Sequence, residues 1–405
     1  MVAAEAGGCL MAKVVSVSLF KPSREYAGHR LYARHLAAIG EKNQVVVVTV
    51  DAEPNSIDLP NIEILQVAPA GKLLQAAPAK VRYLVFTGAK LINGLSMGIG
   101  VRRRIRTDPL VGVFRNADVV ELQWSPALSL VRDVRSMCPG ALIVAYFHEV
   151  LSDPCNTLES RGSKVIDALA AFLLAQERRT EVRALGYLDA AIVLSQKDAD
   201  LLAGLGFRGF VHVVSPPIEV SEVVPPVHQG KTVLFSGHFT RPQNSSGAKW
   251  LIERVWPLVF QQEPEARLVI AGSSPPRWLQ DLGNEGVQIT GLVSDLNEYY
   301  AGARVFAASL LSGAGVKFKV LEAMAHNVPV VATPVAADGI VDLIGKECFV
   351  GISADPKAFA EAVLAALQDD EVCHRPVSRA TQQLEKHYSF ESDTEKIATY
   401  YSKSA

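Results

Sequence analysis

The stretch Val305–Thr333 reads VFAASLLSGAGVKFKVLEAMAHNVPVVAT. It opens with an apolar run, Val305 to Ser309, and continues through a glycine-rich turn into a helical pattern that reaches Met324. A second apolar run, Val328 to Thr333, follows. A strand, a turn, a helix and another strand in this order form the unit that builds a parallel sheet. The stretch therefore predicts an α/β protein.

The same alternation recurs on both sides of this stretch. In the C-terminal half, further strands are predicted at Thr232 to Ser236, Arg267 to Ala271 and Val287 to Thr290, with helices around Trp250 to Phe260 and Leu296 to Ala303. In the N-terminal half, a helix is predicted at Leu31 to Ile39, and strands at Val14 to Phe20, Val45 to Val50, Ile62 to Val67, Asp118 to Gln123, Ala141 to Phe147, Ala190 to Leu194 and Phe210 to Val214. Two doubly wound domains follow from this count.

Length supports the same division, since 405 residues exceed the size at which a single core usually stops growing. The proline pairs Pro216-Pro217 and Pro225-Pro226 mark an extended linker. We expect a disordered leader (1–12), an N-terminal domain (13–214), a linker (215–230), a C-terminal domain (231–374), and helices that pack back on both domains (375–405). The default active site is a cleft between the two domains.

Composition restricts the partners and the compartment. Hydrophobic residues make up 49% of the chain and the formal net charge is −2, which argues against a protein that coats nucleic acid. The five cysteines are scattered without a C-x-x-C pair, which fits a reducing compartment better than a disulfide framework. The start lacks a basic region, so no signal peptide is predicted, and no run spans a bilayer cleanly. We expect a cytoplasmic protein.

The glycine-rich turn within Gly313–Val316 is a candidate anion site. A turn between a strand and a helix directs backbone N–H groups and the positive helix end at an anion, so a phosphate or diphosphate is expected there. Lys319 and Glu322 lie three residues apart on one face of the helix, and a carboxylate there can accept two hydrogen bonds from a ribose diol. A solvated ion pair behind an ordinary turn is the alternative.

These residues resemble the retaining glycosyltransferases of family 4. Glu322, Ala323, Met324 and Ala325, with Pro329 to Ala332, match the second half of the family signature, a glutamate, seven residues, then E-A-x-A-x-G-x-P-V-V. Ala314 stands where the first glutamate would be, as in a branch with a glycine-rich loop and paired lysines, here Lys317 and Lys319. The resemblance implies a GT-B fold, with two Rossmann-like domains facing across a cleft. It also implies that Glu322 binds the ribose of a nucleotide sugar, with Gly313, Ala314, Gly315 and Val316 facing the sugar and phosphates.

Two upstream segments agree with this resemblance. Phe235 to Asn244 reads FSGHFTRPQN, where family members have a glycine and basic residues near the diphosphate, which implies donor-binding roles for Gly237, His238 and Arg241. Asn244 occupies the place of the usual lysine. Gln288 to Tyr300 matches the segment that lines the nucleobase pocket, which adds Gly291 and Val293 to the donor side. An exposed loop arginine is the alternative interpretation of Arg241.

The N-terminal half offers the acceptor side. Gly28, with His29 next to it, matches the second glycine of the family's first turn, while Ala27 replaces the first. The strand Ala141 to Phe147 ends in His148-Glu149, and strand ends of this kind bind ligands in open α/β sheets. The resemblance implies that His148 reaches the donor sugar. A structural histidine is the alternative.

The segment Lys72 to Arg106 contains eight basic residues and no acid, set among apolar residues. Such a surface favours anionic lipid headgroups, and it suggests contact with the inner leaflet near a lipid-linked acceptor. A solvated basic loop is equally compatible with the sequence.

The expected reaction moves a sugar from a nucleotide diphosphate sugar to a carbohydrate or lipid-linked hydroxyl. We expect it to use His148, Arg241, Lys317 and Glu322 and to need neither metal nor cofactor, since fixed cations stabilise the leaving diphosphate. A nicotinamide dehydrogenase fits poorly, because Phe318 occupies the third glycine's place in G-x-G-x-x-G. A nucleotide-sugar epimerase of the same fold and a non-catalytic sugar-nucleotide-binding partner stay open.

Overall fold

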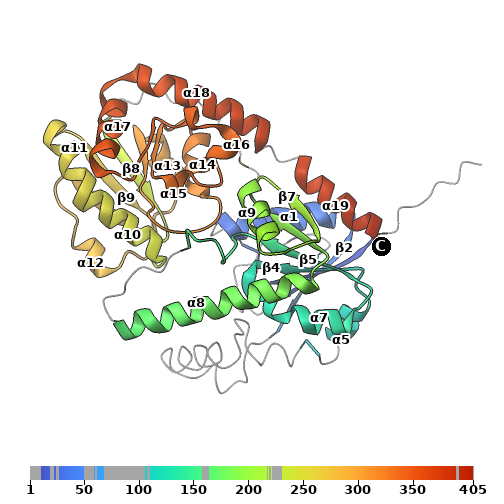
Figure 1. Cartoon of the computed structure of the whole chain (residues 1–405). Helices are drawn as coiled ribbons and strands as arrows, with labels where there is room; N and C mark the ends of the chain where they lie inside the picture. The colour runs from blue at the N-terminus through green and yellow to red at the C-terminus, as the bar shows by residue number, and fades with distance from the viewer. Residues whose placement is uncertain are drawn as a thin grey trace, which may run out of the picture. The chain divides into compact units, whose positions relative to one another are not determined.

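The computed structural model describes residues 11–18, 22–23, 27–49, 59, 62–67, 105–106, 110–156, 164–216, 218, 220, 230–388 and 392–404. These residues form two compact units (Figure 1). Unit 1 takes its described residues from Met1–Asp153, Arg161–Val214 and Glu391–Ala405, and unit 2 takes them from Pro154–Ser160 and Ser215–Phe390. The main division of the chain lies between Val214 and Ser215.

Unit 1 is built on a seven-stranded parallel sheet in the order β3-β2-β1-β4-β5-β6-β7. Its strands are β1 (Lys13–Ser18), β2 (Gln44–Thr49), β3 (Ile62–Gln66), β4 (Val119–Gln123), β5 (Leu142–Phe147), β6 (Ala190–Val193) and β7 (Phe210–Val213). Its helices are α1 (Ala27–Gly40), α5 (Leu110–Arg115), α6 (Trp124–Ala127), η1 (Leu128–Leu130), α7 (Val131–Met137), α8 (Lys164–Ala184), η2 (Leu185–Tyr187), α9 (Gln196–Gly204) and α19 (Ser392–Ser404).

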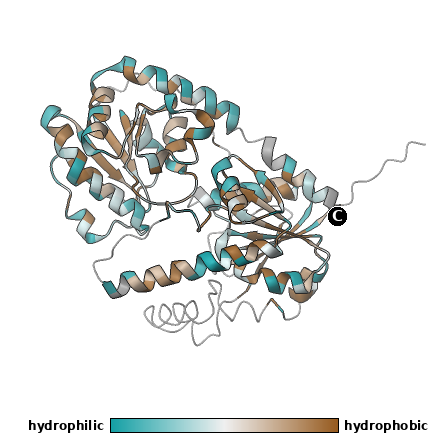
Figure 2. Cartoon of the chain, viewed as in Figure 1, coloured by the Kyte–Doolittle hydropathy of each residue, from teal (hydrophilic) through white to brown (hydrophobic). Residues whose placement is uncertain are grey.

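The two faces of strand β4 differ in chemistry. Val120 and Leu122 point into a large apolar core, which they share with Val15 and Val17 of β1. Successive side chains of a strand point to opposite faces, so Glu121 and Gln123 lie on the other face, and both are fully buried. The strands of both units are mostly apolar, whereas the helices carry polar residues as well (Figure 2). Two polar side chains within such a strand need partners, because an unpaired buried polar group is costly.

Unit 2 repeats the plan with a six-stranded parallel sheet in the order β10-β9-β8-β11-β12-β13. Its strands are β8 (Thr232–Ser236), β9 (Arg267–Ala271), β10 (Val287–Gly291), β11 (Val305–Ala308), β12 (Val330–Ala332) and β13 (Gly351–Ile352). Its helices are α10 (Pro242–Trp250), η3 (Leu251–Val255), α11 (Trp256–Gln262), α12 (Arg277–Gln280), α13 (Asn297–Ala301), α14 (Phe318–Ala325), α15 (Pro334–Ala337), α16 (Val341–Ile344), η4 (Lys346–Cys348), α17 (Pro356–Gln368) and α18 (Asp370–His387). The predicted α/β class and the two doubly wound sheets are confirmed.

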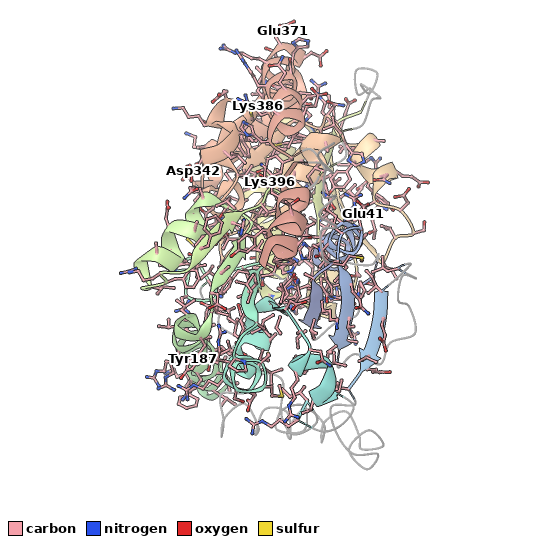
Figure 3. All side chains as sticks on the ribbon, turned by 90° about the vertical axis from the view of Figure 1, so that its right-hand side faces the viewer. Glu41, Tyr187, Asp342, Glu371, Lys386 and Lys396 are labelled. Atoms are coloured by element: carbon pink, nitrogen blue, oxygen red, sulfur yellow. The ribbon has the colours of Figure 1, made fainter. Side chains whose placement is uncertain are left out.

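The two C-terminal helices belong to different units. Helix α18 begins at Asp370, with Glu371 and Lys386 near its two ends, and it belongs to unit 2 (Figure 3). Helix α19 belongs to unit 1, where it packs against α1. Asn43, just after α1, donates a 3.3 Å hydrogen bond to the carbonyl of Ala398 in α19. The last helix is therefore part of the first domain's packing.

Some expectations fall outside the described residues. These are residues 1–10 of the leader, most of the linker, and the basic segment from Lys72 to Arg104. Arg106, at the end of that segment, is described and forms an ion pair with the buried Asp133 of α7. Among the helices described here, none is both long and apolar enough to cross a bilayer.

Candidate functional site

The central strands of unit 2 define one candidate site. Strands β8 and β11 lie side by side, yet the chain continues from β8 toward β9 and from β11 toward β12. Ligands in open α/β sheets bind outside the carboxyl ends of the strands at such a switch point. The segments that follow these two strands are 237–241 and 309–317, and they contain most of the predicted donor residues. We call this place the switch-point site.

Lys319 of α14 brings an ammonium group to the switch-point site. Its Nζ donates to the carbonyl of Ser236 at 2.6 Å and to Oδ1 of Asn244 at 2.8 Å, and it lies 4.6 Å from the centre of the Phe235 ring. Burial, together with the positive charge of Arg241, lowers the pKa of Lys319 to about 7. An anion bound here would stabilise the charged form of this lysine.

Two glycines allow the close packing around this ammonium. A Cβ on Gly237 would come within 2.9 Å of Lys319 Nζ, and a Cβ on Gly272 would come within 1.9 Å of the carbonyl oxygen of Gly237. Gly272 also has a φ of +141°, which side-chain-bearing residues rarely adopt. The backbone after β8 therefore passes directly between the β9 loop and the lysine.

Glu322 lies on α14 one turn beyond Lys319 and interacts electrostatically with it. The hydroxyl of Tyr300 lies 3.5 Å from Glu322 Oε2, and the same hydroxyl is 3.1 Å from Ser236 Oγ. The Tyr300 ring stacks on His326 at 4.9 Å. These contacts hold the half-buried Glu322 carboxylate beside the carboxyl end of β8, within the same cluster as the lysine.

The glycine-rich loop differs in detail from the expectation. Gly313 and Gly315 have φ values of +118° and +72°. The N–H of Gly313 donates to the carbonyl of Cys155 at 2.9 Å, so it is engaged within the protein. Ala314 and Val316 are buried. The loop is a tightly held turn, and the Gly313 N–H, which was expected to face a phosphate, is used in a hydrogen bond within the protein.

Lys317 also departs from its predicted role. Its buried ammonium donates to the carbonyls of Gly313, Ala314 and Gly315, at 3.1, 3.2 and 2.6 Å. A buried ammonium needs acceptors, and the turn carbonyls provide them. The structure therefore places Lys317 as a group that holds the loop together, whereas Lys319 takes the position beside Asn244 that was expected for a phosphate-binding cation.

The remaining donor-side predictions lie around the same edge. His238 is fixed by Ser273 at 2.6 Å and Thr240 at 2.8 Å, and burial with the nearby Arg241 lowers its pKa. Arg241 precedes α10 and is exposed. Gly291, with a φ of +74°, ends β10, and Val293 follows it half-buried. The backbone N–H of Gly272 donates to the Gly291 carbonyl at 3.2 Å, which joins the loops after β9 and β10.

Unit 1 brings its predicted residues together around His148. The ring follows β5 and stacks between Trp124, at 4.2 Å, and Tyr146, at 4.9 Å. Its Nε2 lies 3.1 Å from Gln123 Oε1. Burial, with smaller contributions from His35 and His29, lowers the pKa of His148 to about 3. His148 is therefore neutral at physiological pH.

Gly28 and His29 lie in the first turn of α1, which begins earlier than predicted. A Cβ on Gly28 would lie 3.8 Å from His148 Nδ1, so the two residues are neighbours. His29 Nδ1 lies 3.1 Å from Ser23 Oγ, and the His29 ring packs edge-on against Trp124 at 5.9 Å. For Glu149, the backbone carbonyl accepts a 3.4 Å hydrogen bond from Ser125 Oγ.

Sequence reasoning missed Trp124, Gln123 and Glu121. Trp124 has a φ of +62°, which is unusual for a bulky side chain and tends to mark a functional constraint. Gln123 and Glu121 form a hydrogen bond with each other inside the strand. The sequence did contain a signal for Glu121 and Gln123, because they are two polar residues, two positions apart, in the otherwise apolar strand Val119–Gln123.

Comparisons with known proteins agree with this geometry. Residues 230–369 match the family model described as "Glycosyl transferases group 1". The "Uncharacterized 44.6 kDa protein in cps region" of Klebsiella pneumoniae is 30% identical over 141 residues, 33% of this chain and 36% of the relative. The phosphatidyl-myo-inositol mannosyltransferase of Mycobacterium leprae is 26% identical over 366 residues, 82% of this chain and 91% of the relative.

Among solved structures, HepE of Anabaena in complex with UDP and glucose is similar with a TM-score of 0.66 at 13% identity. The match covers 96% of this chain and 99% of HepE. This likeness confirms the predicted GT-B fold, and the switch-point site lies within residues 230–369, the part of the chain that the family model matches.

Proposed function

We propose that this chain, whose residues 230–369 resemble group 1 glycosyl transferases, is a glycosyltransferase. It moves a sugar from a nucleotide diphosphate sugar to a hydroxyl acceptor, with retention, in bacterial polysaccharide or glycolipid synthesis. The observation that carries the proposal is the placement of Lys319 and Glu322 on one helix at the switch point of unit 2. A cation for the diphosphate and a carboxylate for the ribose stand one helical turn apart.

In this proposal unit 2 binds the donor. The diphosphate lies near Lys319 and Arg241, and the ribose hydroxyls donate to Glu322. As the acceptor oxygen bonds to the anomeric carbon, the bond to the diphosphate oxygen breaks and negative charge grows on the leaving group, whose departing oxygen takes up the proton of the hydroxyl. Fixed cations that stabilise this charge lower the barrier, so no metal is needed. Lys317 contributes indirectly, through the loop that it holds.

Unit 1 holds the acceptor, with Gly28, His29, His148 and Glu149 on that side. The name of the mycobacterial relative indicates a lipid acceptor. A lipid-linked acceptor also agrees with the basic segment from Lys72 to Arg106, which we propose to contact the inner leaflet. The protein would then act in the cytoplasm, peripherally on the membrane.

A thermal-shift screen of UDP- and GDP-sugars tests the donor assignment first. A donor at a hundred times its dissociation constant adds about 2.7 kcal/mol of stability. The stabilising donor is then incubated with candidate lipid and carbohydrate acceptors, with and without EDTA. Transfer in both conditions supports the proposal, and loss of transfer in EDTA contradicts its metal-independent part.

Two other outcomes identify the alternatives. Conversion of the donor into another nucleotide sugar without any acceptor indicates an epimerase. Tight donor binding with neither conversion nor transfer to any acceptor indicates a non-catalytic binding partner, which the alanine at position 314 would favour. Absence of stabilisation by every nucleotide sugar contradicts all three assignments.

A further inference from the structure

A chain of buried polar contacts runs behind His148 in unit 1. We call its members the β4 relay, and they are Tyr401, His35, Glu121, Gln123 and His148. Glu121 Oε2 accepts from the Tyr401 hydroxyl at 3.0 Å and lies 2.8 Å from His35 Nε2. Its other oxygen accepts from the Gln123 amide, and Gln123 in turn meets His148 Nε2 at 3.1 Å. Apart from the half-buried His148, every member is almost completely buried.

Sheet geometry explains why these groups meet. Glu121 and Gln123 are two residues apart on β4, so they share a face. Gln123 is in register with Tyr146 of β5, and His148 follows Tyr146 by two residues. Helices α1 and α19 supply His35 and Tyr401 on the same side. The buried Glu121 carboxylate therefore contacts Gln123 of β4, His35 of α1 and Tyr401 of α19. Of these, Gln123 also contacts His148.

The order of donors and acceptors determines which ring nitrogen of His148 carries the proton. The Gln123 amide turns its NH₂ group toward Glu121 and donates to Oε1, which serves as the acceptor. The amide oxygen then faces His148 Nε2. The opposite amide orientation would set two acceptors, Gln123 Oε1 and Glu121 Oε1, against each other. His148 must therefore carry its proton on Nε2 in order to donate to the oxygen of Gln123.

The other ring nitrogen, Nδ1, then carries no proton and has a free lone pair. His148 Nδ1 is buried and has no hydrogen-bond partner among the residues that the structure describes. Gly28 is a neighbour of this nitrogen, because a Cβ on Gly28 would make ordinary van der Waals contact with Nδ1 at 3.8 Å. A buried acceptor without a donor is costly in a native protein and often indicates a functional role.

We propose that Glu121 and Gln123 are positioning residues that keep the proton of the His148 ring on Nε2 and its lone pair on Nδ1. In this form the ring binds a substrate hydroxyl only by accepting a hydrogen bond at Nδ1. The tautomer is inferred from the hydrogen-bond contacts alone, whereas its effect on sugar transfer rests on the proposed function.

The tautomer is measured by NMR at pH 7 on the full chain labelled with ¹⁵N in its histidine rings. The His148 signals are identified by their loss in His148→Gln. The wild type is expected to show a protonated Nε2 and an unprotonated Nδ1. Gln123→Met, which keeps the volume but removes the amide, and Glu121→Gln should both lose this pattern. Glu63→Gln, an exposed glutamate on β3 of the same sheet, is the matched control and should keep it.

Tyr401→Phe is a milder variant that still tests the proposal if the other variants fail to fold. It removes one hydroxyl from Glu121 without exposing the carboxylate, so a partial loss of the pattern is expected in a folded protein. Protonation of Nδ1 in the wild type overturns the proposal. An unchanged pattern in both folded Gln123→Met and folded Glu121→Gln also overturns it.

Activity provides the second readout. Gln123→Met should lower kcat by about tenfold or more, because a histidine in the wrong tautomer offers a donor where an acceptor is needed. Gly28→Ala places a methyl group in van der Waals contact with Nδ1 and should lower kcat while keeping the wild-type NMR pattern. Donor KM should stay within about twofold in both, since neither residue belongs to unit 2. If the wild type transfers no sugar, the proposed function fails, and the NMR result still decides the tautomer.

Discussion

The Nζ of Lys319 lies 2.8 Å from Oδ1 of Asn244, although the two residues are 75 positions apart in the chain. Asn244 stands at the place where the resemblance to family 4 implies a lysine. The ammonium that this position lacks is therefore supplied from α14, on the other side of the switch point. In the proposed donor site, the cation near the diphosphate therefore comes from Lys319.

Replacing Lys319 by Met should weaken the binding of the nucleotide sugar. A hydrogen bond to a charged group contributes roughly 1.5–3 kcal/mol, which corresponds to a loss of affinity of about tenfold or more. Calorimetric titration measures this change. Lys357→Met, in an exposed position of α17, is the control and should bind normally. Equal affinities of the two variants would remove Lys319 from the donor site.

Donor affinity should fall as the pH rises above 7. The pKa of Lys319 is lowered to about 7 in the free protein by burial, and a bound diphosphate stabilises the charged form and raises this pKa. Binding then takes up a proton, and affinity falls by up to about tenfold per pH unit above 7. Titrations at pH 7 and 8 in buffers of different ionisation enthalpy measure the uptake. An intact nucleotide sugar is used because its diphosphate does not titrate in this range. Proton release, or equal uptake in Lys319→Met, would contradict the assignment.

Glu322→Ala should weaken nucleotide binding, since the ribose loses a charged acceptor whose contribution is roughly 1.5–3 kcal/mol. The loss should be the same for the nucleoside diphosphate and for its sugar conjugate, because both contain the ribose. Glu361→Ala, at an exposed glutamate of α17, serves as the control. The ribose assignment is wrong if the folded Glu322 variant binds as tightly as the control.

His148→Ala should leave donor affinity unchanged and reduce transfer. The ring belongs to unit 1, and the donor residues proposed here belong to unit 2. Thermal shift with the donor and single-turnover transfer measure the two effects separately. His374→Ala, exposed on α18, should behave like the wild type. Normal turnover in the His148 variant would make this histidine a structural residue.

The membrane proposal predicts salt-sensitive sedimentation with vesicles that contain anionic lipid. Arg102, Arg103 and Arg104 are changed to glutamine, whereas Arg106 is kept because it pairs with Asp133. Each basic residue near an anionic surface contributes on the order of 1 kcal/mol, so the triple variant should bind much more weakly. Wild-type binding should decrease in 1 M salt, where the Debye length is about 3 Å.

The control for this experiment changes an equal number of charges elsewhere. Arg375, Arg379 and Lys386 are exposed basic residues of α18, and their change to glutamine should leave sedimentation unaffected. If both triple variants lose binding equally, the attraction reflects overall charge. If the wild type does not sediment at low salt, the proposed membrane contact is wrong.

Strands were the most predictable elements of this fold. Thr232–Ser236 and Arg267–Ala271 have the predicted bounds, because buried parallel strands are short apolar runs between polar turns. Strand β13 was missed, since its two residues, Gly351 and Ile352, are too few to give a periodic signal. Helix α1 was predicted too short because glycine and histidine in its first turn are weak helix formers.

The candidate site was predictable by residue type but not by contact. The sequence placed Lys317 and Lys319 near the same turn and could not say which ammonium the turn carbonyls would bind. That choice depends on the positive φ angles of Gly313 and Gly315, which set the direction of the carbonyls. The polar pair Glu121 and Gln123 was visible in its strand, whereas its partner Tyr401 lies 280 residues further along the chain.

The position of α19 has a consequence for synthesis on the ribosome. The domain translated first cannot complete its packing until the chain has been translated through Tyr401, because that hydroxyl binds Glu121 inside the first sheet. During this interval the second domain is made and can fold, while the buried carboxylate of the first lacks one of its donors. Nascent chains arrested before residue 392 should therefore hold a loosened first domain beside a compact second one.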